Sequence, residues 1–246
     1  MVLAGLVIIS GLAWAHTVYL AQRASSMSSM GMSMPNLQPW SAVDFGTMFV
    51  MWAVMMVAMM VPTAAPMILV FAKVNRTRRE QSRPYVPTGI FLPGYVLAWS
   101  GFAALATLAN WGLHTGGLLS SMIGASTSTM LGGILLLAAG VFQWSPLKYA
   151  CLTQCRSPLG FIMTEWREGA VGALNMGLRH GLYCLGCCWV LMALLFVLGI
   201  MNLLWIAALA GFVLLEKVAP AGHWVSRATG LILIGWAVLI FAEVLS

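Results

Sequence analysis

Residues 45–72 read FGTMFVMWAVMMVAMMVPTAAPMILVFA, an apolar run without a single charged side chain. The run is followed at once by KVNRTRREQSR, residues 73–83, which holds five basic side chains. An α-helix needs about 20 consecutive apolar residues to cross the hydrocarbon core of a bilayer. The first stretch is therefore long enough to span a membrane, and the basic segment after it predicts where the chain leaves the lipid.

The rest of the chain repeats this pattern. Of its 246 residues, 61% are hydrophobic and 7% are charged, whereas soluble domains carry about 25% charged residues. We expect an all-α, polytopic transmembrane helix bundle that forms a single integral membrane domain over residues 1–246. The expected spans number about seven and cover residues 1–22, 45–72, 88–111, 129–150, 181–201, 203–216 and 228–242, of which 203–216 is short.

The basic residues predict the orientation of this bundle. Threading the seven spans alternately places eleven of the twelve Lys and Arg residues on one side, and only Arg23 on the other. Cytoplasmic loops carry the excess of Lys and Arg in membrane proteins. We therefore expect a cytoplasmic N-terminus and a C-terminus outside. The first apolar run has no basic residue before it, so we interpret it as a retained helix rather than a cleaved signal peptide.

All five cysteines lie between residues 151 and 188. Cys151 and Cys155, in KYACLTQCRSP (148–158), are four residues apart and therefore share one face of a helix. Ser145 and Pro146, just before them, are typical of a helix start. We expect this pair at the cytoplasmic end of the fourth span.

A second group lies in RHGLYCLGCCW, residues 179–189. At 100° per residue, one arc of a helix holds four of its side chains: His180, Cys184, Cys187 and Cys188. We expect this group at the cytoplasmic end of the fifth span, where it can face the first pair across the two helices. The alternative is that these are simply small residues at a helix–helix contact.

Thiolates and imidazoles are metal ligands, and thiolates with thioethers nearby favour Cu(I) over harder ions. Five thiols and an imidazole also exceed the four ligands of a closed zinc site. Copper therefore ranks first as the bound metal ion and zinc is the alternative. A disulfide framework is not expected on a side that faces the reducing cytosol.

An acidic residue is expected at the same depth. The sixth predicted span follows the fifth after a turn near Met201 and Asn202, and this antiparallel pairing brings Glu216 level with Cys187. Charged side chains inside a membrane are costly and are candidates for function. Glu216 could ligate the metal, orient the histidine or relay a proton. Alternatively, Glu216 and Lys217 extend to the interface.

Methionine is abundant, and seven of the 18 lie between Met48 and Met67. One helical stripe holds Met48, Met51, Met55 and Met59. The segment after the first predicted span supplies four more on the outer side, Met27, Met30, Met32 and Met34. Thioethers are soft ligands for Cu(I), although methionine is also an ordinary filler of gaps in helix packing. Pro62 and Pro66 are expected to kink the second span.

Several long motifs resemble those of a little-characterised bacterial family of predicted metal-binding integral membrane proteins. They are MWAVMMVAMMVPTAAP (51–66), GYVLAWSGF (94–102), QWSPLKYACLTQCRSPLGF (143–161), GLRHGLYCLGCCWVLM (177–192) and GIMNLLWIAALAGFVLLEK (199–217). The resemblance implies a multi-pass protein of the cell inner membrane. It also implies that the family motifs include the candidate metal ligands Cys151, Cys155, His180, Cys184, Cys187, Cys188 and Glu216.

Three functions follow from these patterns. The first is a metal-binding membrane protein that holds or relays Cu(I) between the outer methionines and the thiols, with a copper-handling protein as partner. The second is a non-catalytic subunit of a larger membrane complex, and the third is a membrane thiol–disulfide oxidoreductase. The sequence has no nucleophile–base pair, phosphate loop or paired catalytic carboxylates, which argues against hydrolase or kinase chemistry. The bilayer is the expected surrounding, and nucleic acid is not an expected partner.

Overall fold

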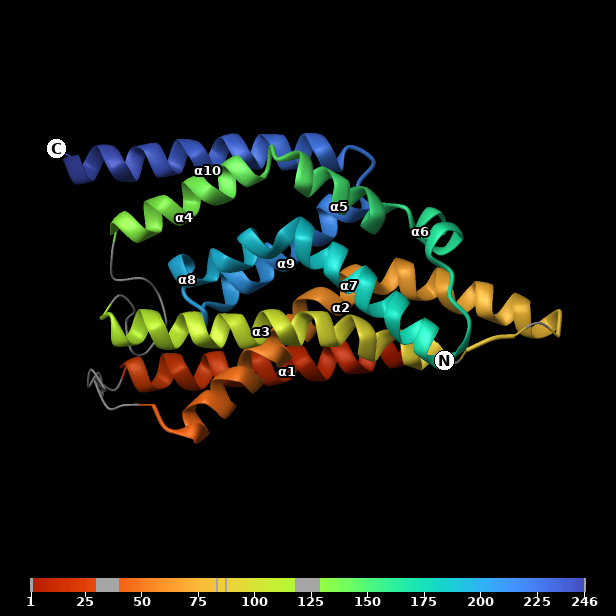
Figure 1. The fold of residues 1–246 in the computed structure, drawn as a ribbon. Coiled ribbons are helices and arrows are strands. Elements are labelled where there is room, and N and C mark those ends of the chain that lie inside the picture. Colours follow the sequence, from red (N-terminus) through yellow and green to blue (C-terminus); the bar gives the residue numbers. More distant parts are fainter. Residues whose placement is uncertain (1, 30–39, 83, 87, 118–128, 246) are drawn as a thin grey trace.

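The computed structural model describes residues 2–29, 40–82, 84–86, 88–117 and 129–245, with the backbone alone for residues 27–29 and 245. Every regular element in these ranges is a helix (Figure 1). In chain order they are α1 (Val2–Ser29), α2 (Ala42–Glu80), η1 (Thr88–Ile90), α3 (Phe91–Thr115), α4 (Thr129–Phe142), α5 (Pro146–Arg156), α6 (Pro158–Glu165), α7 (Gly169–Ala193), α8 (Leu195–Leu198), α9 (Leu203–Val218) and α10 (Gly222–Leu245).

Five of these helical stretches are long and apolar enough to cross a membrane: α1, α2, η1 with α3, α7 with α8, and α10. Helices α4 and α5 together would make a sixth, although they are bent by 63° at the break between them. Helix α9 has 16 residues, which is about 24 Å at 1.5 Å per residue and short of the ~30 Å hydrocarbon core. By length and composition the described helices thus include five candidate spans, or six if α4 and α5 form one, and the expected span over residues 203–216 falls short of this length.

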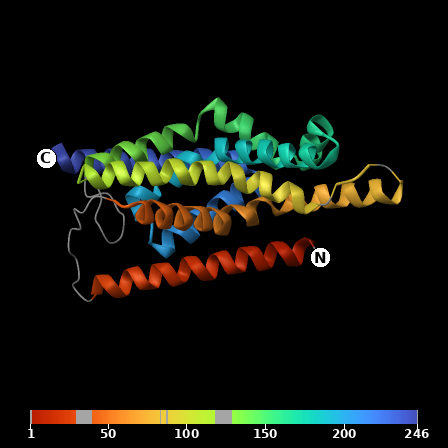
Figure 2. The same cartoon turned by 60° about the horizontal axis from the view of Figure 1, so that its bottom comes forward.

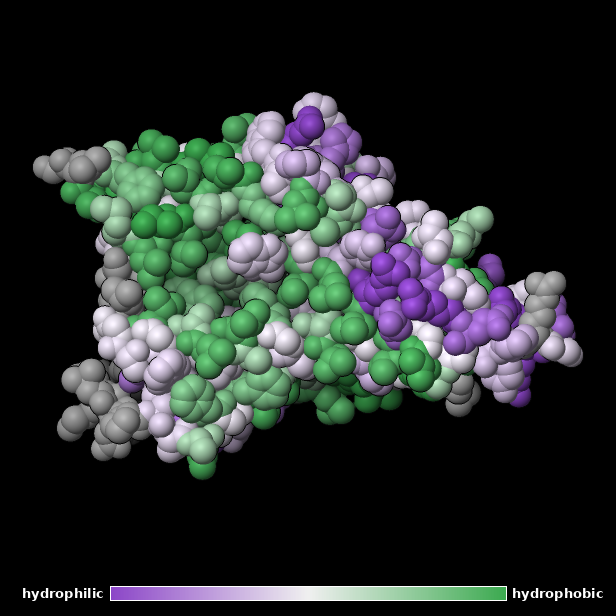
Figure 3. All heavy atoms as spheres, viewed as in Figure 1, coloured by the Kyte–Doolittle hydropathy of each residue, from purple (hydrophilic) through white to green (hydrophobic). Residues whose placement is uncertain are grey.

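The bundle has a buried centre and an apolar periphery. Of the most apolar stretch of each helix, 61% is buried for α2 and 56% for α7 with α8, but only 17% for α1 and 22% for α10. Figure 2 shows α1 along one edge of the molecule. Peripheral side chains such as Leu12 and Ile232 are 68% and 66% exposed. Apolar side chains cover most of the face in Figure 3, as expected for a surface that faces lipid.

The two ends of the bundle differ. The start of α1, the far end of α2 and helix α6 point toward one end, and α10 finishes at the other (Figures 1 and 2). Helix α2 has 39 residues and projects beyond its neighbours at the first end. Hydrophilic side chains gather there in Figure 3. Arg78 on this projection pairs with Glu168 at a distance of 2.8 Å and so ties α2 to the start of α7.

The expected span over residues 129–150 is broken into α4 and α5. The Ser145 hydroxyl accepts a hydrogen bond from the Lys148 backbone N–H at 3.1 Å, and Pro146 occupies the first turn of α5. A new N-cap followed by proline ends one helix and starts another. The first cysteine pair therefore lies on a separate short helix, α5, rather than at the end of a continuous span.

Helix α7 begins at Gly169, well before the expected start of that span at residue 181. Arg179, which set the expected boundary, forms an ion pair with Glu165. Arginine is a good helix former, so the helix continues through a residue that interrupts only the apolar run. The second cysteine group is therefore in the middle of a long helix, and not at its mouth.

Helices α3 and α7 pack backbone to backbone. A Cβ atom on Gly177 would overlap the carbonyl oxygen of Phe91, and one on Gly181 would lie 2.7 Å from the Cβ of Ala98. Small residues let helix backbones approach closely in membrane proteins. This contact brings Tyr95 of α3 against Cys184 of α7.

Candidate metal centre

The five cysteines gather between α5 and α7. All carry free thiols, and four of them are at most 9% exposed, whereas Cys151 is partly exposed. We call this group the thiol cluster: Cys151, Cys155, Cys184, Cys187 and Cys188. The structure thus brings together two groups of residues that are about 30 positions apart in the chain.

Helix α5 contributes one sulfur to the buried part of the cluster. The side chain of Cys155 interacts with those of Cys184 and Cys187 on α7. The thiols of Cys187 and Cys188 both donate to the backbone carbonyl of Cys184, at 3.0 Å. Little more than one turn of α7 and one residue of α5 therefore supply four sulfurs to one region of the core.

Cys151 lies at the edge of the cluster. A Cβ atom on Gly186 would be 2.6 Å from the sulfur of Cys151, so the missing side chain of this glycine makes room for the thiol. Cys151 also interacts electrostatically with Cys187. It is the thiol of the cluster that is partly open to the surroundings.

A buried lysine faces the cluster from α9. The Lys217 ammonium is 2.9 Å from the sulfur of Cys184 and donates to it, and it donates to the Thr63 hydroxyl at the same distance. Lys217 is only 8% exposed. The expectation that this turn of α9 lies level with the thiols is therefore correct, although the direct contact is made by Lys217.

Cys184 is also held from α3. The Tyr95 hydroxyl is 3.0 Å from the sulfur of Cys184 and donates to the Met60 carbonyl at 3.0 Å. Thr63 donates to the same carbonyl at 2.9 Å. Together with Lys217 these contacts close a ring of hydrogen bonds that joins α2, α3, α7 and α9 around one sulfur.

Glu216 is paired with a different lysine. Its carboxylate is 2.6 Å from the ammonium of Lys148, and Ser226 donates to the same oxygen. Lys148 in turn donates to the side-chain carbonyl of Gln143. The second carboxylate oxygen of Glu216 has no hydrogen-bond partner among the described residues. Glu216 does interact electrostatically with Cys187, so it borders the cluster as expected.

Lys148 and Lys217 are therefore not markers of solvated loops. The side chain of Lys148 is fully buried, and that of Lys217 nearly so. Charges that are paired inside the protein do not report where the chain meets water, so these two carry no weight for the orientation, and their placement on the cytoplasmic side stays a prediction.

His180 lies one turn before Cys184, inside an aromatic enclosure. Its ring centroid is 5.4 Å from that of Phe161, 5.9 Å from that of Tyr95 and 6.1 Å from that of Phe91. The imidazole is 2% exposed, and its Nδ1 atom has no hydrogen-bond partner in the described part of the chain. A buried nitrogen without a partner is available for a ligand.

The candidate ligands do not form a closed set. Within the described ranges, no three histidine, cysteine or acidic side chains are arranged to hold one metal ion. The reason lies in their present bonds: two thiols point at a backbone carbonyl, and the sulfur of Cys184 is held by Lys217 and Tyr95. Binding a metal would require these side chains to turn from their present partners.

The methionine stripe on α2 is buried in its second half. Met55 and Met59 of the stripe are at most 2% exposed, as are Met56, Met60 and Met67 on the same helix. Met48 and Met51 are partly buried, and Met48 accepts a hydrogen bond from Asn110. The outer methionines Met30, Met32 and Met34 lie outside the described residues, as does the side chain of Met27.

Sequence reasoning missed Tyr95, Thr63 and Lys148. Tyr95 lies in the GYVLAWSGF motif and Thr63 follows Pro62, but neither is of a type that suggests a metal. Lys148 offered a clearer signal, because it is a charge inside a predicted span.

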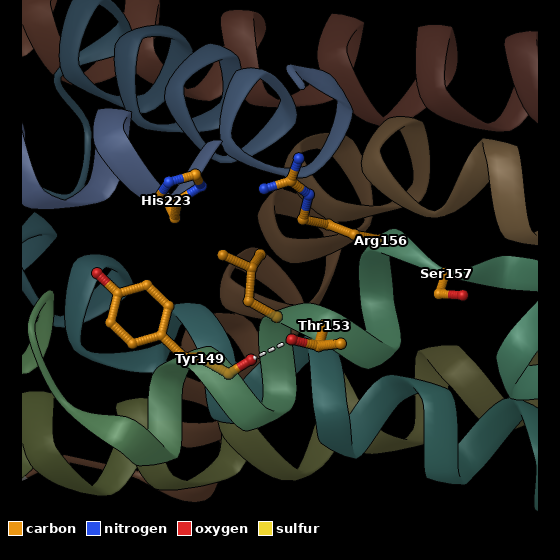
Figure 4. Close-up of a pocket in the computed structure, with 6 residues that line it drawn as sticks. Tyr149, Thr153, Arg156, Ser157 and His223 are labelled. Carbon is orange, nitrogen blue, oxygen red and sulfur yellow. Dashed lines mark hydrogen bonds between the residues drawn. The ribbon is translucent and has the colours of Figure 1, made fainter. Parts of the chain in front are cut away.

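A separate cavity of about 310 Å³ lies beside α5. Its walls include Tyr149, Arg156 and His223 (Figure 4). Arg156 also donates to the carbonyl of Ala219, at 2.6 Å. None of the predicted site residues lines this cavity. It is therefore distinct from the thiol cluster.

The fold and the site define an all-helical protein with helices long enough to span a membrane and a buried group of thiols. Residues 49–240 match the family model PpoB2, described as a copper chaperone, and the chain belongs to this family. The matched range includes all seven candidate ligands together with Tyr95 and Lys217. No curated protein and no solved structure matches the chain.

Proposed function

We propose that this protein is a multi-pass inner-membrane copper chaperone that holds Cu(I) at the thiol cluster and relays it to a copper-handling partner. The candidate ligands are Cys151, Cys155, His180, Cys184, Cys187, Cys188 and Glu216. The observation that carries the proposal is the meeting of Cys155 with Cys184 and Cys187 across two helices, in a chain of the copper chaperone family.

The chemistry of the buried groups supports copper as the cargo. Thiolates select soft ions such as Cu(I), and an apolar surrounding limits water and oxidants. His180 adds an imidazole with an unpartnered nitrogen. Glu216 is supported as a neighbour of the site more than as a ligand, because its charge is offset by Lys148.

The methionines of α2 support a route to the cluster. Met60 lies next to the thiols, because the Tyr95 hydroxyl donates to the Met60 carbonyl and also contacts the sulfur of Cys184. Met55, Met56 and Met59 continue along the buried side of the same helix. Thioethers bind Cu(I) weakly, so a row of them is suited to passing the ion rather than keeping it. In this proposal Cu(I) moves along α2 between the outer side and the thiol cluster.

The proposed orientation has the N-terminus in the cytoplasm, the C-terminus outside and seven passes. Helix α9 is short, but it leads the chain back from the end of α8 to the start of α10, as a seventh pass requires (Figure 1). The projecting end of α2 supports the orientation, because it carries the exposed residues Arg76 and Arg79.

Metal analysis of the purified full-length protein tests the proposed function. We expect anaerobically prepared wild-type protein to retain Cu(I), and the Cys184→Ser/Cys187→Ser variant to lose most of it. Thr153→Ser, on an exposed position of α5 that lines the separate cavity, serves as the matched control and keeps the metal. Equal and negligible copper in all three proteins would contradict the proposal.

A further inference from the structure

Lys217 brings a positive charge into the core without a carboxylate to balance it. Its hydrogen-bonding partners in the described ranges are the Thr63 hydroxyl and the Cys184 sulfur, each at 2.9 Å. The adjacent residue, Glu216, is already paired with Lys148 at 2.6 Å. Burying an unbalanced charge costs several kcal/mol. Cys184 is the ionisable side chain in contact with the Lys217 ammonium, so its thiol is placed to supply the balancing negative charge.

This arrangement has a consequence for the charge of a bound metal. A soft ion held by two deprotonated thiols meets two negative charges, and Lys217 supplies one positive charge beside them. A monovalent ion then makes the buried group neutral. A divalent ion in the same place leaves one net positive charge in the core, which is disfavoured in a medium of low dielectric constant.

We propose that Lys217 makes the thiol cluster selective for monovalent soft cations, Cu(I) above all, over the divalent ions Zn(II) and Cd(II). The inference rests on the proposed function, because it concerns the same thiols. Lys217 acts as a fixed countercharge and keeps its proton throughout. The thiol that balances Lys217 is already deprotonated, and the second thiol that becomes a ligand releases its proton to the solvent as the metal binds.

The ring of hydrogen bonds keeps this charge in place. Thr63 holds the ammonium from α2, and Tyr95 holds the sulfur of Cys184 from α3. The hydroxyls of Thr63 and Tyr95 also both donate hydrogen bonds to the Met60 carbonyl. A long, flexible lysine side chain is thus restrained on two sides, and its charge stays next to the sulfur that the metal would use.

The wild-type protein tests charge selection without any substitution. Ag(I) and Cd(II) are both soft, and they differ in charge. We expect purified full-length protein in detergent, incubated with equal concentrations of the two ions, to take up Ag(I) at least tenfold more than Cd(II). Uptake of Cd(II) equal to that of Ag(I) would overturn the proposal, because softness alone would then explain binding.

Variants at Lys217 test the residue itself. Lys217→Gln and Lys217→Met remove the charge, Lys217→Arg keeps it, and Lys73→Gln removes an exposed charge elsewhere. With Cu(I) and Zn(II) supplied together, we expect the Cu(I)-to-Zn(II) ratio to fall about tenfold in the neutral variants, or about 1.4 kcal/mol. The Arg variant and the Lys73 control keep the wild-type ratio.

The outcomes separate this inference from the proposed function. Folded neutral variants with an unchanged ratio overturn the role of Lys217 and leave the chaperone proposal intact. Wild-type protein that binds neither Cu(I) nor Ag(I) overturns the proposed function itself. If both neutral variants fail to fold, equal uptake of Ag(I) and Cd(II) by the wild type still overturns the proposal, and a ratio that falls in Lys217→Arg, which keeps the charge, also counts against it.

Discussion

Lys148 and Lys217 bury two positive charges in the bundle, and each meets a different kind of partner. Lys148 is matched by the carboxylate of Glu216, and Lys217 by the sulfur of Cys184. Glu216 and Lys217 are adjacent in the chain, so one turn of α9 serves both contacts. This division suggests that the first lysine holds the fold around the cluster and that the second acts on the cluster itself.

A double-mutant cycle tests the role assigned to Lys148. We expect Lys148→Met or Glu216→Met alone to lower the free energy of unfolding by about 3–5 kcal/mol, because each leaves a buried charge without its partner. The double variant should recover most of the loss. Thermal unfolding in detergent measures the stability, and copper content is measured on the same samples. A double variant that is stable but free of copper would instead make Glu216 a ligand.

At this scale the sequence predicts residue types and their faces, and little of how they pair. The helical phase predicts that His180 and the cysteines of α7 share one face. The antiparallel pairing of the fifth and sixth predicted spans places Glu216 at the same depth. The partners Tyr95, Thr63 and Lys148 come from other helices. Their contacts depend on how those helices pack, which a local pattern does not encode.

The elements that build the site depend on close helix contacts. Gly177 lets α7 touch α3 at the carbonyl of Phe91, one turn before Tyr95. Gly186 lets the sulfur of Cys151 approach α7. Two glycines on one helix thus bring two neighbouring helices to the thiols.

Substitution of Gly177 tests the first of these contacts. We expect Gly177→Val to push α3 away from α7, to lower the free energy of unfolding by about 1–3 kcal/mol and to speed alkylation of Cys184, since Tyr95 withdraws from its sulfur. Gly101→Val on α3 is the matched control, because a Cβ atom there meets nothing within 4 Å. Equal alkylation rates in the two variants would argue against this contact as the support of the site.

Element boundaries were predictable where charge and apolarity agree. The run over residues 45–72 corresponds to α2, which extends to Ala42–Glu80. Two boundaries failed for physical reasons. Arg179 interrupts the apolar run but not the helix, because arginine is a good helix former, and the Ser145 cap with Pro146 divides the expected span over 129–150. Ser145 and Pro146 are a recognisable helix start in the sequence, but the apolar run around them favoured one continuous helix.

At the scale of the molecule, charge and apolar surface are separated. Exposed apolar side chains cover α1 and α10, and the exposed arginines Arg76 and Arg79 lie on the projecting end of α2. The all-helical class was predictable from composition alone. The number of spans was not, because α9 is short, with one face buried and the other exposed, so its role depends on the packing around it.

Reporter fusions to the full chain test the proposed orientation. We expect alkaline phosphatase joined after Ser246 to be active and a fluorescent protein at the same place to be dark, because seven passes put the C-terminus outside. A fluorescent protein inserted at Tyr85, between α2 and η1, is the control and should be bright. A bright C-terminal fusion would indicate an even number of passes.

The unequal exposure of the five thiols sets the order in which they can react. Cys151 is partly open, whereas the other four sulfurs are closed off by the bundle. A reagent that approaches α5 from outside the bundle thus reaches the sulfur of Cys151 before the other four. A small covalent adduct on Cys151 would therefore block access to the cluster from the α5 side, even though the other four sulfurs are unmodified.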